Sequence, residues 1–198
     1  MSRGVIFLTS FVFFFFSFSV FAPAQDQDTG NTPYFDYAFK EFGIFSGYHH
    51  GTLKAQDDYI VIPAMLHWGF DLRPLIKNKS NILLEVVLEP FINTVVSPDS
   101  NVEIGNNFLL KIGFPLTPRI YPYFEGGLGM VYLTQHTIEQ STQFNFTDQA
   151  GVGITFFLKK NLGLSLGYRF RHISNASIKE PNNGINTDSA ICGISFLY

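Results

Sequence analysis

The chain contains little charge and almost no cysteine. Cys192 is the single cysteine, so no disulfide can form within the chain. Charged residues make up 15% of the sequence, whereas soluble domains carry about 25%. The formal net charge of −3 is too small to indicate nucleic-acid binding. These shortages exclude a disulfide-stabilised scaffold and argue against an ordinary soluble domain.

Long apolar runs are absent after Phe21, so no transmembrane helix is predicted beyond that point. Residues 1–24 have the parts of a secretory signal peptide, namely Arg3, the apolar run from Val5 and a small-residue cleavage site ending at Ala24. We expect cleavage near Ala24, and an uncleaved membrane anchor is the alternative because the apolar run is long. Residues 25–40 are polar and aperiodic, and they are predicted to form a periplasmic N-terminal arm.

Aromatic residues are abundant, at 17% of the chain. Eight later segments alternate apolar residues with small or polar ones, as where Val102 and Ile104 alternate with Glu103 and Gly105. Strands of about ten residues with this period of two are typical of outer-membrane barrels. The sequence therefore predicts an all-β fold, an eight-stranded antiparallel transmembrane β-barrel over residues 41–198. A soluble β-sandwich or a lipocalin-like barrel is the alternative. The expected strands are residues 42–51, 58–70, 81–93, 102–114, 120–134, 143–158, 162–174 and 188–198.

The polar face of these segments predicts a filled barrel interior. Eight strands enclose a space just wide enough to be packed with side chains, so a channel is not expected. The candidate inward charges are Glu85, Glu89, Lys111, Glu125, Arg169 and Arg171.

The connections predict which end of the barrel faces outward. Those at 115–119 and 159–161 are short, whereas those at 94–101, 135–142 and 175–187 are long, as for periplasmic turns and outer loops. The connection 71–80 is too long for this rule. The last residue, Tyr198, is an aromatic end that resembles the signal read by the barrel-assembly machinery.

A histidine and a serine form the strongest candidate site. His172 and Ser174 are two residues apart in the segment 162–174, so both project from one face of the strand. That face is the apolar one, which also carries Tyr168 and Phe170. With both barrel ends in the periplasm, this segment ends at the outer leaflet, where the substrate would be lipopolysaccharide or phospholipid. A β-bulge before Ser174 would instead turn the pair into the lumen.

Serine becomes a nucleophile when a base removes its proton, and a third group commonly orients that base. His172 is the candidate base, and the nearby acids are Glu180 and Asp188. Asn175 and Asn182 are candidate donors to an oxyanion. The sequence contains no cluster with metal-ligand spacing and no cofactor motif, so neither a metal nor a cofactor is expected.

The residues His172-Ile-Ser174-Asn175-Ala176, followed by Lys179, Pro181-Asn182 and Gly184-Ile185, resemble the PagL family of outer-membrane lipid A 3-O-deacylases. The resemblance extends from about Phe42 to Tyr198. It implies an eight-stranded barrel that removes the ester-linked acyl chain at the 3-position of lipid A without a metal. It also implies that Ser174 is the nucleophile, that His172 is the base, that Asn182 contributes to the oxyanion hole and that Asn175 supports the site. The implied partners are lipopolysaccharide and the outer membrane of a Gram-negative cell, and a homodimer is left open.

Two positions depart from the family pattern. Asn186 stands where the family has its triad glutamate. Asn186 could still accept a hydrogen bond from the imidazole, and Asp188 or Glu180 could replace the acid. Ser177 stands where the family often has glycine, a change that keeps a backbone donor if no positive φ is needed. A non-catalytic structural or adhesive barrel and an outer-membrane phospholipase are therefore the alternative functions.

Overall fold

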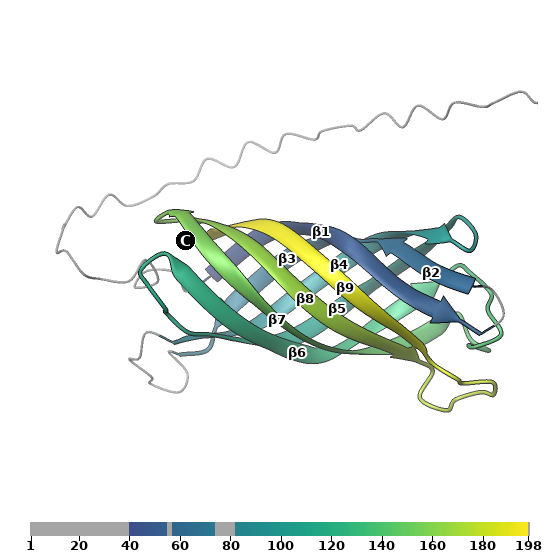
Figure 1. The fold of residues 1–198 in the computed structure, drawn as a ribbon. Coiled ribbons are helices and arrows are strands. Elements are labelled where there is room, and N and C mark those ends of the chain that lie inside the picture. The colour runs from purple at the N-terminus through teal and green to yellow at the C-terminus, as the bar shows by residue number, and fades with distance from the viewer. Residues whose placement is uncertain (1–39, 55–56, 74–81, 198) are drawn as a thin grey trace, which may run out of the picture. The chain divides into compact units, whose positions relative to one another are not determined.

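The computed structural model describes residues 40–54, 57–73 and 82–197. The predicted signal peptide (1–24), residues 25–39 of the predicted arm and Tyr198 lie outside these ranges, as does most of the connection 71–80. No helix among the described residues is long and apolar enough to cross a membrane. The described residues form an antiparallel β-barrel (Figure 1).

The barrel closes because its first and last strands pair. The strand order otherwise follows the chain, and β1 pairs with β9 from Glu41 to Gly51. Two short strands, β2 and β3, both pair with β1 and with β4, so they are the two parts of one strand interrupted at Pro63. Proline has no N–H to donate to the ladder, which accounts for the interruption. The ring therefore has the eight strands that the sequence predicts. The strands are β1 (Lys40–Leu53), β2 (Asp57–Ile62), β3 (Ala64–Asp71), β4 (Leu83–Ser97), β5 (Asn101–Gly113), β6 (Ile120–Leu133), β7 (Phe144–Lys159), β8 (Leu162–Ser174) and β9 (Ile185–Leu197).

The start of the last strand is the boundary that matters most for the site. It was predicted at residue 188, but β9 begins at Ile185. The polar residues 186–188 resemble a loop in the sequence, yet Ile185 and Thr187 are buried in the lumen whereas Asn186 and Asp188 face outward. The predicted start was wrong because polar residues fit both faces here: Thr187 faces the polar lumen, and the outward Asn186 and Asp188 are hydrogen-bonded to His172 and Tyr168 on β8. Asn186 consequently lies in a strand and not in a loop.

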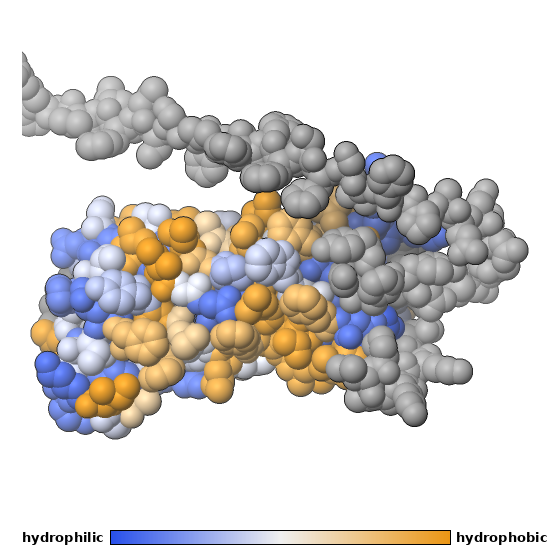
Figure 2. Space-filling view, turned by 180° about the vertical axis from the view of Figure 1, so that it is seen from behind, coloured by the Kyte–Doolittle hydropathy of each residue, from blue (hydrophilic) through white to orange (hydrophobic). Residues whose placement is uncertain are grey.

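Apolar side chains cover the outside of the barrel. Along each strand buried residues alternate with outward ones, and Ile44, Phe124 and Leu128 are at least 60% exposed to solvent in the isolated chain. On the face seen in Figure 2, apolar residues cover much of the wall, and many residues at the end that carries the β6–β7 and β8–β9 loops are hydrophilic. Such a surface is stable in lipid and costly in water. The arrangement confirms the predicted transmembrane barrel and argues against the soluble alternatives.

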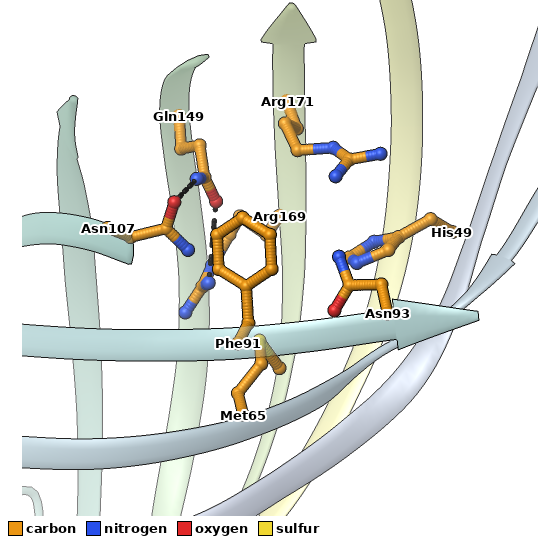
Figure 3. A pocket seen from close by; sticks show the side chains of 8 residues that line it. All are labelled: His49, Met65, Phe91, Asn93, Asn107, Gln149, Arg169 and Arg171. Carbon is orange, nitrogen blue, oxygen red and sulfur yellow. Dashed lines mark hydrogen bonds between the residues drawn. The ribbon is translucent and has the colours of Figure 1, made fainter. Parts of the chain in front are cut away.

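Ion pairs fill the lumen. Arg169 lies 2.6 Å from Glu89 and 2.8 Å from Glu125, while Arg171 lies 2.7 Å from Glu103. Figure 3 shows both arginines with the amide side chains of Asn93, Asn107 and Gln149, around a cavity of about 10 Å³. That volume holds about one water molecule. The predicted inward charges are confirmed, and the interior is packed.

Two long loops lie at one end of the barrel, on the right in Figure 1. The β6–β7 loop (134–143) and the β8–β9 loop (175–184) lie there, whereas the opposite end carries the short β7–β8 turn at 160–161. The chain enters β1 and leaves β9 at that opposite end, because Glu41 pairs with Leu197. Two connections depart from the predicted lengths: the β4–β5 connection, predicted as a long loop over 94–101, covers only 98–100, and the long β3–β4 connection starts and ends at the opposite end. The lengths of the β6–β7 and β8–β9 loops and of the β7–β8 turn follow the rule for outer-membrane barrels, so the end with these two loops is the outer end.

Candidate active site

His172 and Ser174 project outward from the last residues of β8. The pairing of β8 with both neighbours is unbroken from Gly163 to Ile173, so no bulge reverses the alternation before Ser174. Arg171 and Ile173 are accordingly buried in the lumen, while His172 and Ser174 are half-exposed on the lipid side. Phe170 and Tyr168 continue the same face toward the middle of the membrane and are 40% and 48% exposed.

A hydrogen bond orients the imidazole of His172. Its Nδ1 lies 2.6 Å from the side-chain oxygen of Asn186, which is the cross-strand partner of His172 on β9. Because an amide oxygen can only accept, Nδ1 carries the proton and Nε2 keeps its lone pair. The ring is therefore held in the tautomer that can accept a proton from a serine hydroxyl.

The two alternative acids have other partners. Asp188 accepts a hydrogen bond from the hydroxyl of Tyr168, and Glu180 accepts one from the backbone N–H of Asn182 at 3.1 Å. Of these three residues, Asn186 is the one that contacts His172 Nδ1.

Gly184 packs against the imidazole ring. It has a φ of 74°, and a Cβ at this position would overlap Cε1 of His172 and lie 3.1 Å from Nε2. Only glycine satisfies both conditions, since other residues resist a positive φ and bring a Cβ. Together, Asn186 and Gly184 fix the ring from the β9 side.

The asparagines of the β8–β9 loop form a short chain of hydrogen bonds. The backbone N–H of Asn175 donates to the side-chain oxygen of Asn182 at 2.8 Å. The amide oxygen of Asn182 is thus occupied, and its two Nδ2 protons remain to donate to a ligand. Asn175 itself is fully buried.

Ser177 has a positive φ, although a serine was expected to be tolerated here only without one. Its φ is 60°, and that of Ala176 is 54°. Left-handed backbone costs a non-glycine residue about 1–2 kcal/mol because Cβ approaches a carbonyl oxygen. A serine at this position therefore strains the backbone. This corrects the expectation that serine can replace glycine here without cost.

Asp148 is a neighbour of His172 that the sequence reasoning missed. It is exposed on the outward face of β7 and is the cross-strand partner of His172 on the side opposite Asn186. Directly opposed residues have Cβ atoms about 4.5–5.5 Å apart. The signal was present in the sequence, because a carboxylate on an apolar face is costly in a membrane and calls for a function.

In the described part of the chain, no hydrogen bond joins the side chains of His172 and Ser174. Positions two apart on a strand are separated by about 6.6 Å, which an imidazole leaning along the strand can span to a serine hydroxyl. Such contacts often tighten only when the substrate binds. Among the described residues, no group of three or more histidine, cysteine, aspartate or glutamate side chains is arranged to hold a metal ion.

A second histidine–serine pair lies inside the lumen, where His49 contacts the hydroxyl of Ser189. Both residues are buried, at 3% and 2% exposure. The adjoining cavity of about 10 Å³ is too small for an ester substrate. Only the pair on β8 is open to lipid.

Comparisons with known proteins identify similar chains. A family model described as lipid A 3-O-deacylase (PagL) matches residues 43–195. The lipid A deacylase PagL of Pseudomonas aeruginosa is 34% identical over 73 residues, which are 35% of this chain and 40% of that protein. The match thus spans less than half of that relative.

Solved structures show the same fold. The crystal structure of the outer membrane enzyme PagL matches with a TM-score of 0.59 and 22% identity, over 77% of this chain and 97% of that one. Neisserial surface protein A matches with a TM-score of 0.56 and 10% identity, over 81% of this chain and 98% of that one. At these identities the structural likeness supports the barrel fold alone.

Proposed function

Because the chain belongs to the PagL family of lipid A 3-O-deacylases and is an outer-membrane β-barrel, we propose that it hydrolyses the 3-O-linked acyl ester of lipid A. The single observation that best supports this proposal is the 2.6 Å contact between His172 Nδ1 and Asn186 on the lipid-facing side of β8. It leaves Nε2 as a base beside Ser174, at the leaflet where lipid A resides.

The proposed reaction proceeds in two steps. Ser174 Oγ attacks the ester carbonyl while His172 Nε2 takes the hydroxyl proton, and the oxyanion accepts hydrogen bonds from Asn182 Nδ2. The tetrahedral intermediate then collapses, the bond to the sugar oxygen breaks, and the sugar hydroxyl leaves with the proton from His172. Water next attacks the acyl-serine with His172 again as base, which releases the fatty acid and restores Ser174.

Two side chains flank the base in this proposal. Asn186 orients the ring but, being neutral, adds no charge to stabilise the imidazolium that forms during the reaction. The carboxylate of Asp148, across the strand on β7, supplies the negative charge instead. In a serine triad one acid both orients the histidine and stabilises the imidazolium. Here Asn186 performs the first role and Asp148 the second.

The acyl chains need no enclosed pocket. The side chains below the site on the same face of β8 are Phe170, Tyr168 and Leu166, and each is at least 40% exposed toward lipid. A fatty chain already in the leaflet can lie along this apolar surface while its ester reaches Ser174.

The test compares purified barrels carrying Ser174→Ala or Ser189→Ala with the wild type, using lipid A and a phospholipid as parallel substrates. We expect the wild type and Ser189→Ala to release fatty acid from lipid A and Ser174→Ala to release none. Ser189 is the matched control, since it is a strand serine beside a histidine but faces the lumen.

Two other results would replace the proposal. Hydrolysis of phospholipid and not of lipid A would identify a phospholipase. No hydrolysis of either substrate would favour the structural or adhesive barrel, although the intact orientation of His172 by Asn186 argues against a decayed site. Recognition of Tyr198 by the barrel-assembly machinery and formation of a homodimer stay predictions.

A further inference from the structure

The β6–β7 loop is paired with the β8–β9 loop that carries the proposed site. Ser141 N donates to Pro181 O at 3.0 Å, and Asn183 N donates to Glu139 O at 2.9 Å. These two bonds flank a bridge between Gln140 and Asn182. A segment contributed by another strand pair therefore holds the backbone on both sides of Asn182.

The side chain of Ser141 adds a second layer of contacts. Its hydroxyl donates to Lys179 O at 2.7 Å and accepts from Asn175 Nδ2 at 3.2 Å. Asn175 Nδ2 also donates to Lys179 O at 2.7 Å. Ser141 Oγ, Asn175 Nδ2 and Lys179 O thus form a triangle of hydrogen bonds beneath the loop.

This triangle is connected to the proposed oxyanion donor. Asn175 is fully buried, so a side-chain proton left without an acceptor would be costly there and the amide would shift. The backbone N–H of Asn175 in turn holds the side-chain oxygen of Asn182 at 2.8 Å. The direction of Asn182 Nδ2 therefore depends, through Asn175, on the hydroxyl of Ser141.

We propose that Ser141 is a positioning residue of the proposed esterase, acting through Asn175 to aim Asn182 at the oxyanion. The inference rests on the proposed function, because it assigns a role within that reaction. Ser141 should affect kcat and not KM, because it lies in the β6–β7 loop and not on the apolar face of β8 where the acyl chains would lie.

The test uses Ser141→Ala, with Ser141→Thr as the conservative variant and Thr142→Ala as the matched control. Thr142 is the next residue of the same loop, but its hydroxyl donates to Asn145 at 3.2 Å and not to the β8–β9 loop. Steady-state hydrolysis of lipid A gives kcat and KM, and a serine-directed fluorophosphonate measures the reactivity of Ser174. Rates are normalised to folded barrel, judged by its altered mobility on unheated gels.

We expect Ser141→Ala to lower kcat and the phosphonylation rate about 10-fold with little change in KM, because small displacements of a catalytic donor reduce the rate strongly. Ser141→Thr should restore most of the rate, and Thr142→Ala should match the wild type. Since Ser141 acts through Asn175, adding Ser141→Ala to Asn175→Ala should lower the rate no further.

Two outcomes would overturn the positioning role. Ser141→Ala could react with the phosphonate as fast as Thr142→Ala, or its effect could be fully additive with that of Asn175→Ala. The proposed function fails separately, in the case where Ser174→Ala still hydrolyses lipid A.

Discussion

At the residue scale, the proposed site has a neutral amide where a serine triad has a carboxylate, since Asn186 presents an amide oxygen to His172 Nδ1 at 2.6 Å. We predict that Asn186→Leu, which removes the acceptor, lowers kcat about 100-fold, the lower range of what a positioned base contributes. Asn186→Asp keeps the acceptor and adds the charge that favours the imidazolium, so its kcat should equal or exceed that of the wild type. Hydrolysis rates of the purified variants check both expectations. Equal rates for Asn186→Leu and the wild type would refute the orienting role.

Gly184 supports a second prediction at this scale. Gly184→Ala adds a methyl group that would overlap Cε1 of His172, so the ring must shift from its present position. A displacement of about 1 Å can cost about 100-fold in rate, and we expect kcat to fall by that order while the barrel still folds. The folded fraction on gels and the hydrolysis rate measure the two effects separately. An active Gly184→Ala variant would mean that the ring is free to adjust.

At the scale of the elements, the β8–β9 loop has left-handed backbone at two residues that carry a Cβ. Ala176 and Ser177 have φ values of 54° and 60°. Ser177→Gly removes a steric cost of about 1–2 kcal/mol and adds part of that back as chain entropy. We therefore predict a net gain of about 0.5–1 kcal/mol in the free energy of unfolding. Urea unfolding of barrels in lipid vesicles measures it, and a loss of stability would contradict the assignment of strain.

Alternation with a period of two predicted the strands and their faces, because it depends only on which side of the wall each residue meets. The outward placement of His172 and the lumen placement of Arg169 follow from it. The cross-strand partner of a residue cannot be derived from this alternation, because the register of each strand depends on the pairing of the whole ring. The pairings of His172 with Asp148 and Asn186 and the contact of Ser141 with Asn175 therefore required the structure. The positive φ of Ser177 was also not predictable, because serine rarely adopts that conformation and its presence in a sequence does not indicate it.

At the scale of the whole molecule, the barrel wall is supported by buried charges. Arg169 on β8 contacts Glu89 on β4, across the lumen, and Glu125 on β6, two strands away. Arg169→Leu would leave both carboxylates without their cation, and breaking a buried pair costs about 3–5 kcal/mol. We predict a loss of that order in the free energy of unfolding. Lys159→Leu, at the end of β7, is an exposed control. Equal stability of the two variants would contradict the account of the lumen.

We propose that the lipid-facing Ser174 of this outer-membrane barrel removes one acyl chain from lipid A. The decisive experiment is mass spectrometry of lipid A from Gram-negative cells that express the wild type or Ser174→Ala. We expect lipid A from the wild-type culture to lack the ester-linked chain at the 3-position and lipid A from the Ser174→Ala culture to retain it. Identical acylation in the two cultures, with both barrels folded in the outer membrane, would refute the proposed role of Ser174.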